Sequence, residues 1–97
     1  MAEINVNRIK LSQLRALVAI ARTGTFSDAA SQLDLSQSAV SHAIATLETE
    51  LGVSLLSRGR QGAVLTPVGQ QVTTEAQTML SHLKNIGRKA QDAKGLQ

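Results

Sequence analysis

The chain has 97 residues, which is enough for one small domain and leaves little room for a second. Ten Lys and Arg against seven Asp and Glu give a formal net charge of +3, a weak bias toward anionic partners. The absence of cysteine excludes disulfides and thiolate metal sites, and no apolar run approaches the ~20 residues that span a bilayer. We therefore expect a protein of the cytoplasm, with no membrane segment and no cofactor.

The first predicted element is a helix built on aliphatic residues. Phe26 is the only aromatic residue although 42% of the chain is apolar, so the core should be aliphatic and helical. Residues 1–10 show no periodicity and are expected to be a loose lead-in. From Leu11 onward, apolar residues recur at helical spacing, which predicts a helix that ends near Thr23. Gly24 suits the left-handed conformation that closes a helix.

A short second helix is expected to follow and to end near Leu33. Its start is ambiguous because two residues could cap it: Ser27, or Thr25 together with Asp28. Small residues in this helix allow a close approach to the next one. We expect Leu33 and Leu35 to fill the corner between the second and third helices.

The third helix has the clearest amphipathic pattern. Ser36 is a good N-cap, Gly52 a good terminator, and the apolar residues between them are spaced at steps of four, three and four: Val40, Ile44, Leu47 and Leu51. The opposite face is polar, although such a stripe is also typical of any solvated helix. Short apolar stretches at 55–56 and 64–65 then predict a small β-hairpin.

A long fourth helix is predicted from Thr66 as N-cap and Pro67 as first residue, reaching about residue 90 and frayed beyond. Its apolar residues form an unbroken heptad seam: Val72, Ala76, Met79, Leu83, Ile86 and Ala90. So small a domain cannot cover a seam of this length, so we expect it to pair with the same helix of a second chain. Residues 1–66 then form the head and residues 67–97 the dimerisation helix.

This order of elements predicts a mainly α fold: a winged helix-turn-helix of three helices and a β-hairpin wing, followed by a long dimerising linker helix. In such domains the third helix enters the major groove of DNA, and helix N-termini bind phosphate. The candidate DNA-binding residues are the two N-cap candidates and the polar face of the third helix: Ser27, Ser36, Gln37, Ser38, Ser41 and His42.

The stretch from Phe26 to Leu51 and the hairpin resemble the N-terminal domain of LysR-type transcriptional regulators of bacteria. The shared motifs are Ala29–Ala30, Ser36–Ser41, Leu47–Glu48, Leu55–Arg58 and Leu65–Gly69. The resemblance implies a homodimer on double-stranded DNA, with its two linker helices antiparallel, at an interrupted palindromic operator. It also implies that Arg58 and Arg60 of the wing lie in the flanking minor groove. Family members usually carry a C-terminal inducer-binding domain. That domain is absent here, so we expect the chain to be a fragment.

The sequence departs from the family pattern at several contact positions. His42 stands where many members have Arg, and Ala43 and Ala45 replace longer polar residues. We therefore expect the third helix to make few direct contacts with base edges. Arg60 lies one place early, with Gln61 at the usual basic position, so its contact is less secure than that of Arg58.

An enzyme is not expected. His42 and His82 are the only histidines, and the acidic residues show no metal-ligand spacing. Ser41 is not activated by His42, because adjacent helical residues point about 100° apart. The serious alternative is a protein-interaction module, in which a helical dimeriser presents a head that binds another protein. Binding of duplex DNA at moderate salt discriminates between the two.

Overall fold

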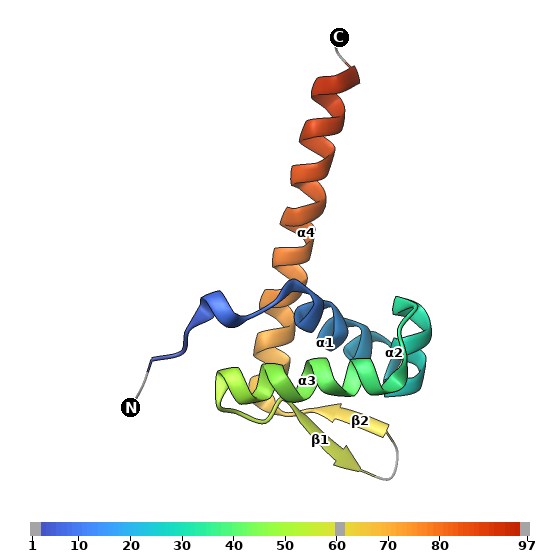
Figure 1. Ribbon diagram of the computed structural model, residues 1–97, viewed down its shortest axis with the longest axis vertical. Helices are drawn as coiled ribbons and strands as arrows, with labels where there is room; N and C mark the ends of the chain where they lie inside the picture. The colour runs from blue at the N-terminus through green and yellow to red at the C-terminus, as the bar shows by residue number, and fades with distance from the viewer. Residues whose placement is uncertain (1–2, 60–61, 96–97) are drawn as a thin grey trace.

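A computed structural model describes residues 3–59 and 62–95 and shows a small head from which one long helix projects (Figure 1). The elements in chain order are η1 (Val6–Arg8), α1 (Leu11–Thr23), α2 (Phe26–Leu33), α3 (Gln37–Leu51), β1 (Leu56–Gly59), β2 (Gly62–Leu65) and α4 (Pro67–Gly95). The predicted architecture, a mainly α winged helix-turn-helix followed by a long helix, is confirmed. The projecting part of α4 makes the molecule elongated, with extents of 54 × 36 × 21 Å.

The core of the head is aliphatic, as the composition predicts, and α1 lies at its centre between the other helices. The core consists of buried residues from α1, α2, α3 and the start of the hairpin: Ala16, Leu17, Ala19, Ile20, Ala29, Ala30, Val40, Ile44, Leu47, Leu55 and Leu56. The small side chains of Ala29 and Ala30 let α2 approach its neighbours closely. Each fully buried Leu, Ile or Val stabilises the head by about 1.5–3 kcal/mol before the cost of ordering the chain is subtracted.

Local hydrogen bonds fix where α2 and α3 begin. Thr25 is extended, with φ −140° and ψ 153°, and its Oγ1 accepts a hydrogen bond of 3.0 Å from the backbone N–H of Asp28. Thr25 is therefore the N-cap of α2, as the second of the two possibilities has it, and the prediction of Ser27 as the cap is wrong, because Ser27 lies inside the first turn. Ser36 is confirmed as the N-cap of α3, since its Oγ accepts from the N–H of Ala39 at 3.1 Å.

The turn between α2 and α3 differs from expectation at one residue. Leu33 is half-buried and packs against the core, as predicted, whereas the side chain of Leu35 is 47% exposed. Asp34 ends α2 in the left-handed conformation, with φ 59°, and the N–H of Leu35 donates to the carbonyl of Ala30 at 2.9 Å. This sharp reversal directs Leu35 outward, so the prediction that Leu35 fills the corner is wrong.

The wing is fastened to the turn between α1 and α2. β1 and β2 pair antiparallel with Leu56 opposite Leu65. The N–H of Ala63 donates to the carbonyl of Gly24, the residue that ends α1 in the left-handed conformation, at 3.1 Å. Gly62 has φ +105°, and a Cβ there would lie 2.7 Å from the Gly24 carbonyl oxygen. Only glycine fits this position, so the hairpin has a fixed place beside the helices.

The early turns of α4 pack against the head, and its later turns are exposed to solvent. It begins at Pro67 with Thr66 as N-cap, as predicted, and the N–H of Gly69 donates to Thr66 Oγ1 at 3.0 Å. Its early turns pack on α1, where Gly69, Thr73 and Ala76 are buried. The helix continues to Gly95, more than one turn beyond the predicted end near residue 90. Within residues 3–59 and 62–95, no helix has the length and apolarity needed to cross a membrane.

The lead-in to α1 is more ordered than the sequence suggested. Val6–Arg8 form one turn of 3-10 helix, capped by Asn5, whose Oδ1 accepts a hydrogen bond of 3.1 Å from the N–H of Asn7. The expectation of a structureless lead-in is therefore wrong for these residues. The missing periodicity is explained by length, because a single turn is too short to show a pattern.

Candidate nucleic-acid interface

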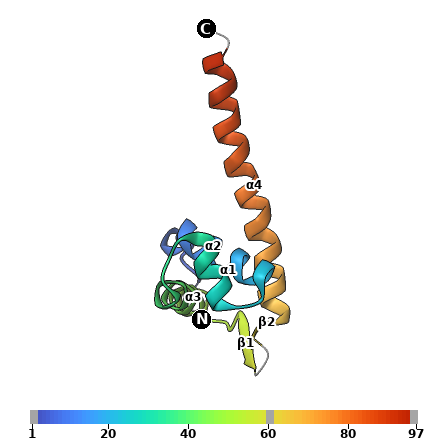
Figure 2. The same ribbon diagram turned by 90° about the vertical axis from the view of Figure 1, so that its right-hand side faces the viewer.

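α3 turns one face into the core and the other to solvent, on the side of the head away from α4 (Figure 2). Val40, Ile44 and Leu47 are fully buried beneath it. Most of the predicted contact residues of this helix are exposed on the other face, and Ser41 is half-buried: Gln37, Ser38, Ser41 and His42. The exposed first turn of α3 is free to approach the edge of another molecule.

The first turns of α2 and α3 meet the root of the wing in a shallow hollow of about 330 Å³. The structure brings three of the predicted residues together there, Ser27, Gln37 and Ser41, beside Gly62 and Ala63 of β2. Helix N-termini carry partial positive charge from unpaired backbone N–H groups. The hollow therefore combines polar side chains with an electrostatic preference for an anion such as a phosphate.

Ser36 and Ser38 lie beside each other at the tip of α3. Their Oγ atoms are 3.2 Å apart, within hydrogen-bonding distance, and both residues are exposed. Because the Ser36 hydroxyl also accepts the N–H of Ala39, its orientation is fixed by the cap itself. Ser38 is held by Ser36, so one cap orders two hydroxyls at the outer surface of the head.

The other flank of α3 has a basic character that the sequence interpretation missed. Arg8 and Lys10, from the segment before α1, line a hollow of about 270 Å³ with His42 and Glu50 of α3. Sequence reasoning treated residues 1–10 as a loose lead-in and gave these two cations no role. Two basic residues directly before the first helix are the signal that could have revealed them.

The wing carries the two remaining predicted contacts. The backbone of Arg58 lies in β1 opposite Ala63. The side chain of Arg58 and all of Arg60 lie outside the described residues, as does Gln61. The position of the wing is described, and it lies next to α3 (Figure 1).

Glu48 positions the wing, a role that sequence reasoning did not assign. Its Oε2 accepts hydrogen bonds from the backbone N–H groups of Leu55 at 2.7 Å and Leu56 at 3.3 Å. The Thr66 hydroxyl donates to the carbonyl of Ser54 at 2.7 Å. A carboxylate bonded to backbone donors is a strong anchor. Glu48 thus ties the base of the hairpin to α3, so the two candidate contact elements move as one unit.

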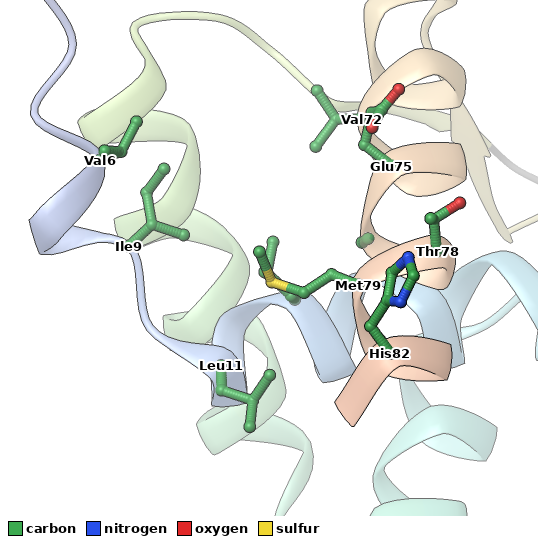
Figure 3. A pocket seen from close by; sticks show the side chains of 10 residues that line it. Val6, Ile9, Leu11, Val72, Glu75, Thr78, Met79 and His82 are labelled. Atoms are coloured by element: carbon green, nitrogen blue, oxygen red, sulfur yellow. The ribbon is translucent and has the colours of Figure 1, made fainter. Parts of the chain in front are cut away.

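The predicted dimerisation residues divide into two groups. Val72 packs against the core and Ala76 is only 3% exposed, because α1 covers it within the same chain. The remaining residues of the seam are open: Met79 is 53% exposed, Leu83 37% and Ile86 66%, and Ala90 is exposed as well. Of these residues, Met79 lines a groove of about 720 Å³ between α4 and the N-terminal segment (Figure 3), and Leu83 lines a separate hollow with Arg15 and Arg22 of α1.

An exposed polar helix that follows a tight helical turn and is held beside a β-hairpin defines the winged helix-turn-helix class of DNA-binding domain. Among the side chains in residues 3–59 and 62–95, no three His, Cys, Asp or Glu gather as a metal site. The surface is suited to recognition of a polyanion by hydrogen bonds and backbone N–H groups.

Comparison with known proteins extends this assignment. The profile of the family described as bacterial regulatory helix-turn-helix protein, lysR family, matches residues 11–70. The probable HTH-type transcriptional regulator LrrA of Synechococcus elongatus is 56% identical over 89 residues, which cover 92% of this chain and 30% of LrrA. This chain therefore belongs to the LysR family and carries its helix-turn-helix DNA-binding domain.

Solved structures agree in fold. The DNA-binding domain of CbnR in complex with DNA has a TM-score of 0.80 and 31% identity, covering 87% of this chain and 97% of that one. The oxidized form of Corynebacterium glutamicum OxyR has a TM-score of 0.85 and 36% identity, covering 91% of this chain and 27% of that one. The chain thus spans less than a third of the length of LrrA and of OxyR.

Proposed function

We propose that this chain binds double-stranded DNA with sequence specificity as a homodimer, with α3 in the major groove and the wing at the flanking minor groove. The observation that carries the proposal is the exposed first turn of α3, fixed beside the hairpin by Glu48 and by the bond from Ala63 to Gly24. The similar CbnR domain was solved in complex with DNA, and the match to this chain covers 97% of that domain.

The exposed residues of α3 suggest distinct contacts. Gln37 can pair with adenine at two points, and Ser38 and Ser41 can donate to or accept from several base edges. His42 lies further along the helix, near Arg8 and Lys10. Since serine and histidine discriminate bases less strictly than a bidentate residue does, we assign the main base-specific contact to Gln37.

Phosphate contacts are assigned to the surroundings of α3. Ser27 and Ser36 lie at the N-terminal turns of α2 and α3, where backbone N–H groups and the helix dipole favour an anion. Arg8 and Lys10 supply full positive charges on the opposite flank of α3. The predicted wing contacts, Arg58 and Arg60, complete the proposal at the minor groove.

The homodimer is proposed from the open part of the α4 seam. Met79, Leu83 and Ile86 expose apolar surface on a helix that its own head covers only in the early turns. A symmetric dimer presents two copies of α3, so its site is an interrupted palindrome. As a regulator that acts on DNA, the chain is proposed to work in the cytoplasm and to catalyse no reaction.

Selection of bound sequences from random duplexes tests this function. The expected result is enrichment of two inverted half-sites at a fixed spacing, retained at moderate salt. If no sequence were enriched and DNA binding disappeared at moderate salt, the result would instead favour the alternative in which the head binds a protein.

A further inference from the structure

The heptad seam of α4, which is exposed from Met79 onward, has the same spacing of apolar residues in both directions. Val72, Ala76 and Met79 lie nine, five and two residues before Ser81, and Leu83, Ile86 and Ala90 lie two, five and nine residues after it. Two such helices paired antiparallel, with the two-fold axis at the level of Ser81, therefore place each seam position at the level of another seam position. Met79 then lies opposite Leu83 of the second copy. Ile86 of the second copy lies at the level of Ala76, which α1 covers, so it packs against the wall of the groove that Ile9 and Leu11 form.

The groove beside α4 has room for apolar side chains of this second helix. Figure 3 shows Met79 extending from α4 toward Ile9 and Leu11, with His82 about one turn further along the same helix. The groove of about 720 Å³ begins near Val72, the level at which the antiparallel arrangement places the final turns of the second α4. Ile86, which is 66% exposed in one chain, is the side chain that would enter the groove of the other.

Charges on the edge of the seam favour the same arrangement. Glu75, His82 and Lys89 are spaced by seven residues, so they share one flank of the heptad seam. In the antiparallel register, Glu75 lies next to Lys89 of the second copy, and this opposite-charge pair occurs twice. A parallel pair of helices would place the uncharged Leu80 near Glu75 and leave the carboxylate without a cation.

The same register brings His82 of one copy next to His82 of the other at the axis. We propose that these two imidazoles form a pH-sensitive contact, so that protonation weakens the dimer. The inference rests on the proposed homodimer and on the antiparallel pairing that the family resemblance implies, and it adds the register at the level of Ser81 and a means of control. Two like charges facing each other across a partly dehydrated seam repel, so the dimer is favoured when the imidazoles are neutral.

The other ionisable groups around His82 leave this contact dominant. The N-terminal segment and α1 line the groove with apolar side chains only: Val6, Ile9, Leu11 and Leu14. On α4 itself, Glu75 and Lys89 are two turns away on either side and neutralise each other between copies. Lys84, Arg15 and Arg22 lie on the other flank of the seam, in a hollow that Leu83 also lines.

Sedimentation of the 97-residue chain at pH 7.5 and pH 5.5 tests the pH-sensitive contact. We expect the dimer dissociation constant to rise about tenfold or more at the lower pH, because two imidazolium charges then face each other across the seam. His82→Gln should remain dimeric and lose this dependence. His42→Gln, which alters the other histidine of the chain on α3, should keep it. A wild-type dimer without pH dependence, or a His82→Gln dimer with the full dependence, would overturn the proposal.

Cross-linking tests the register separately, because the chain has no cysteine of its own. His82→Cys should be joined between copies by a short bis-maleimide, whereas Ser81→Cys, which lies outside the seam in the hollow with Arg15 and Arg22, should not. A mixture of Glu75→Cys and Lys89→Cys chains should cross-link. Glu75→Cys alone should not, since its two copies would lie about 18 Å apart along the axis.

The outcomes separate this inference from the function on which it rests. Cross-linking of Glu75→Cys to itself, in a chain that still dimerises and selects inverted half-sites, refutes the antiparallel register and leaves the proposed function intact. A wild-type chain that is monomeric at high micromolar concentration refutes both the register and the proposed dimer. A dimer with the expected cross-links and pH dependence supports both.

Discussion

The head and the distal half of α4 differ in how completely one chain buries its own apolar surface. In the head, Leu17, Ile44 and Leu55 are fully buried, and the wing and helices are joined by backbone hydrogen bonds. In the distal half of α4, every described residue from Ser81 onward is exposed, including Leu83 and Ile86. One chain is therefore sufficient to fold the head, and the exposed seam needs a second molecule to be covered.

The same glycine substitution in the two parts of α4 gives the largest expected contrast. A Cβ at Gly69 would collide with the carbonyl of Leu55, whereas a Cβ at Gly87 meets nothing within 4 Å. Gly69→Ala should lower the free energy of unfolding by about 3 kcal/mol, because backbone cannot move aside cheaply. Gly87→Ala should leave the head unchanged and raise helix stability by up to about 1 kcal/mol. Denaturant titration measures both, and equal effects would contradict the division.

A charge in the seam should separate assembly from folding. Leu83→Glu places a carboxylate in the proposed dimer interface, where an unpaired buried charge costs several kcal/mol. The dimer dissociation constant should rise at least about 100-fold by sedimentation. The unfolding of the head should change little, because Leu83 is not among the residues that pack against its core. Asn85→Glu, at an exposed position outside the seam, is the matched control, and loss of the dimer in both variants would mean that the interface lies elsewhere.

Loss of the Glu48 carboxylate should loosen the wing within an otherwise intact head. Glu48→Gln removes a charged acceptor from two backbone N–H groups, which predicts a loss of about 1–2 kcal/mol. Hydrogen exchange at the amides of Leu55 and Leu56 should accelerate more than exchange in α1. Glu50→Gln, two residues further along α3, is the control and should leave these amides protected. If exchange at the Leu55 and Leu56 amides were as slow in Glu48→Gln as in wild type, the carboxylate would not anchor the wing.

The sequence was most informative where structure is decided locally. The caps at Ser36 and Thr66 and the end of α1 at Gly24 depend on a few neighbouring residues, and all were predicted. The start of α2 was ambiguous because Thr25 and Ser27 are both good caps. The choice between them depends on which residue adopts the extended backbone, and the sequence pattern does not show that.

Contacts between distant residues could not be predicted in the same way. Ala76 fits the heptad seam in sequence, but α1 covers it in the fold, and Leu35 points outward because Asp34 reverses the chain. The positioning role of Glu48 depends on the N–H groups of Leu55 and Leu56 across a turn. Periodicity identifies which face of a helix is apolar, and it does not identify which neighbour covers that face.

Removal of one positive charge from each region gives the smallest expected effect. Arg8→Ala, beside α3, should weaken binding to specific and random duplexes alike, by a few fold, and lower the slope of log affinity against log salt by about 0.9. Arg88→Ala makes the same change on the exposed distal half of α4 and should alter neither quantity. Fluorescence anisotropy at several salt concentrations measures both variants. An equal salt slope for wild type and Arg8→Ala would remove Arg8 from the interface.

The central claim, that the exposed first turn of α3 reads the base sequence, is tested most directly by removing one glutamine from each region. Affinities of wild type, Gln37→Ala and Gln91→Ala are measured for the selected duplex and for a scrambled one. Gln37→Ala should lose about 1–3 kcal/mol on the selected duplex and almost nothing on the scrambled one, since it removes a base-edge contact. Gln91→Ala, on the distal half of α4, should bind both as wild type does. Equal losses on both duplexes for Gln37→Ala, or no loss on either, would contradict the account.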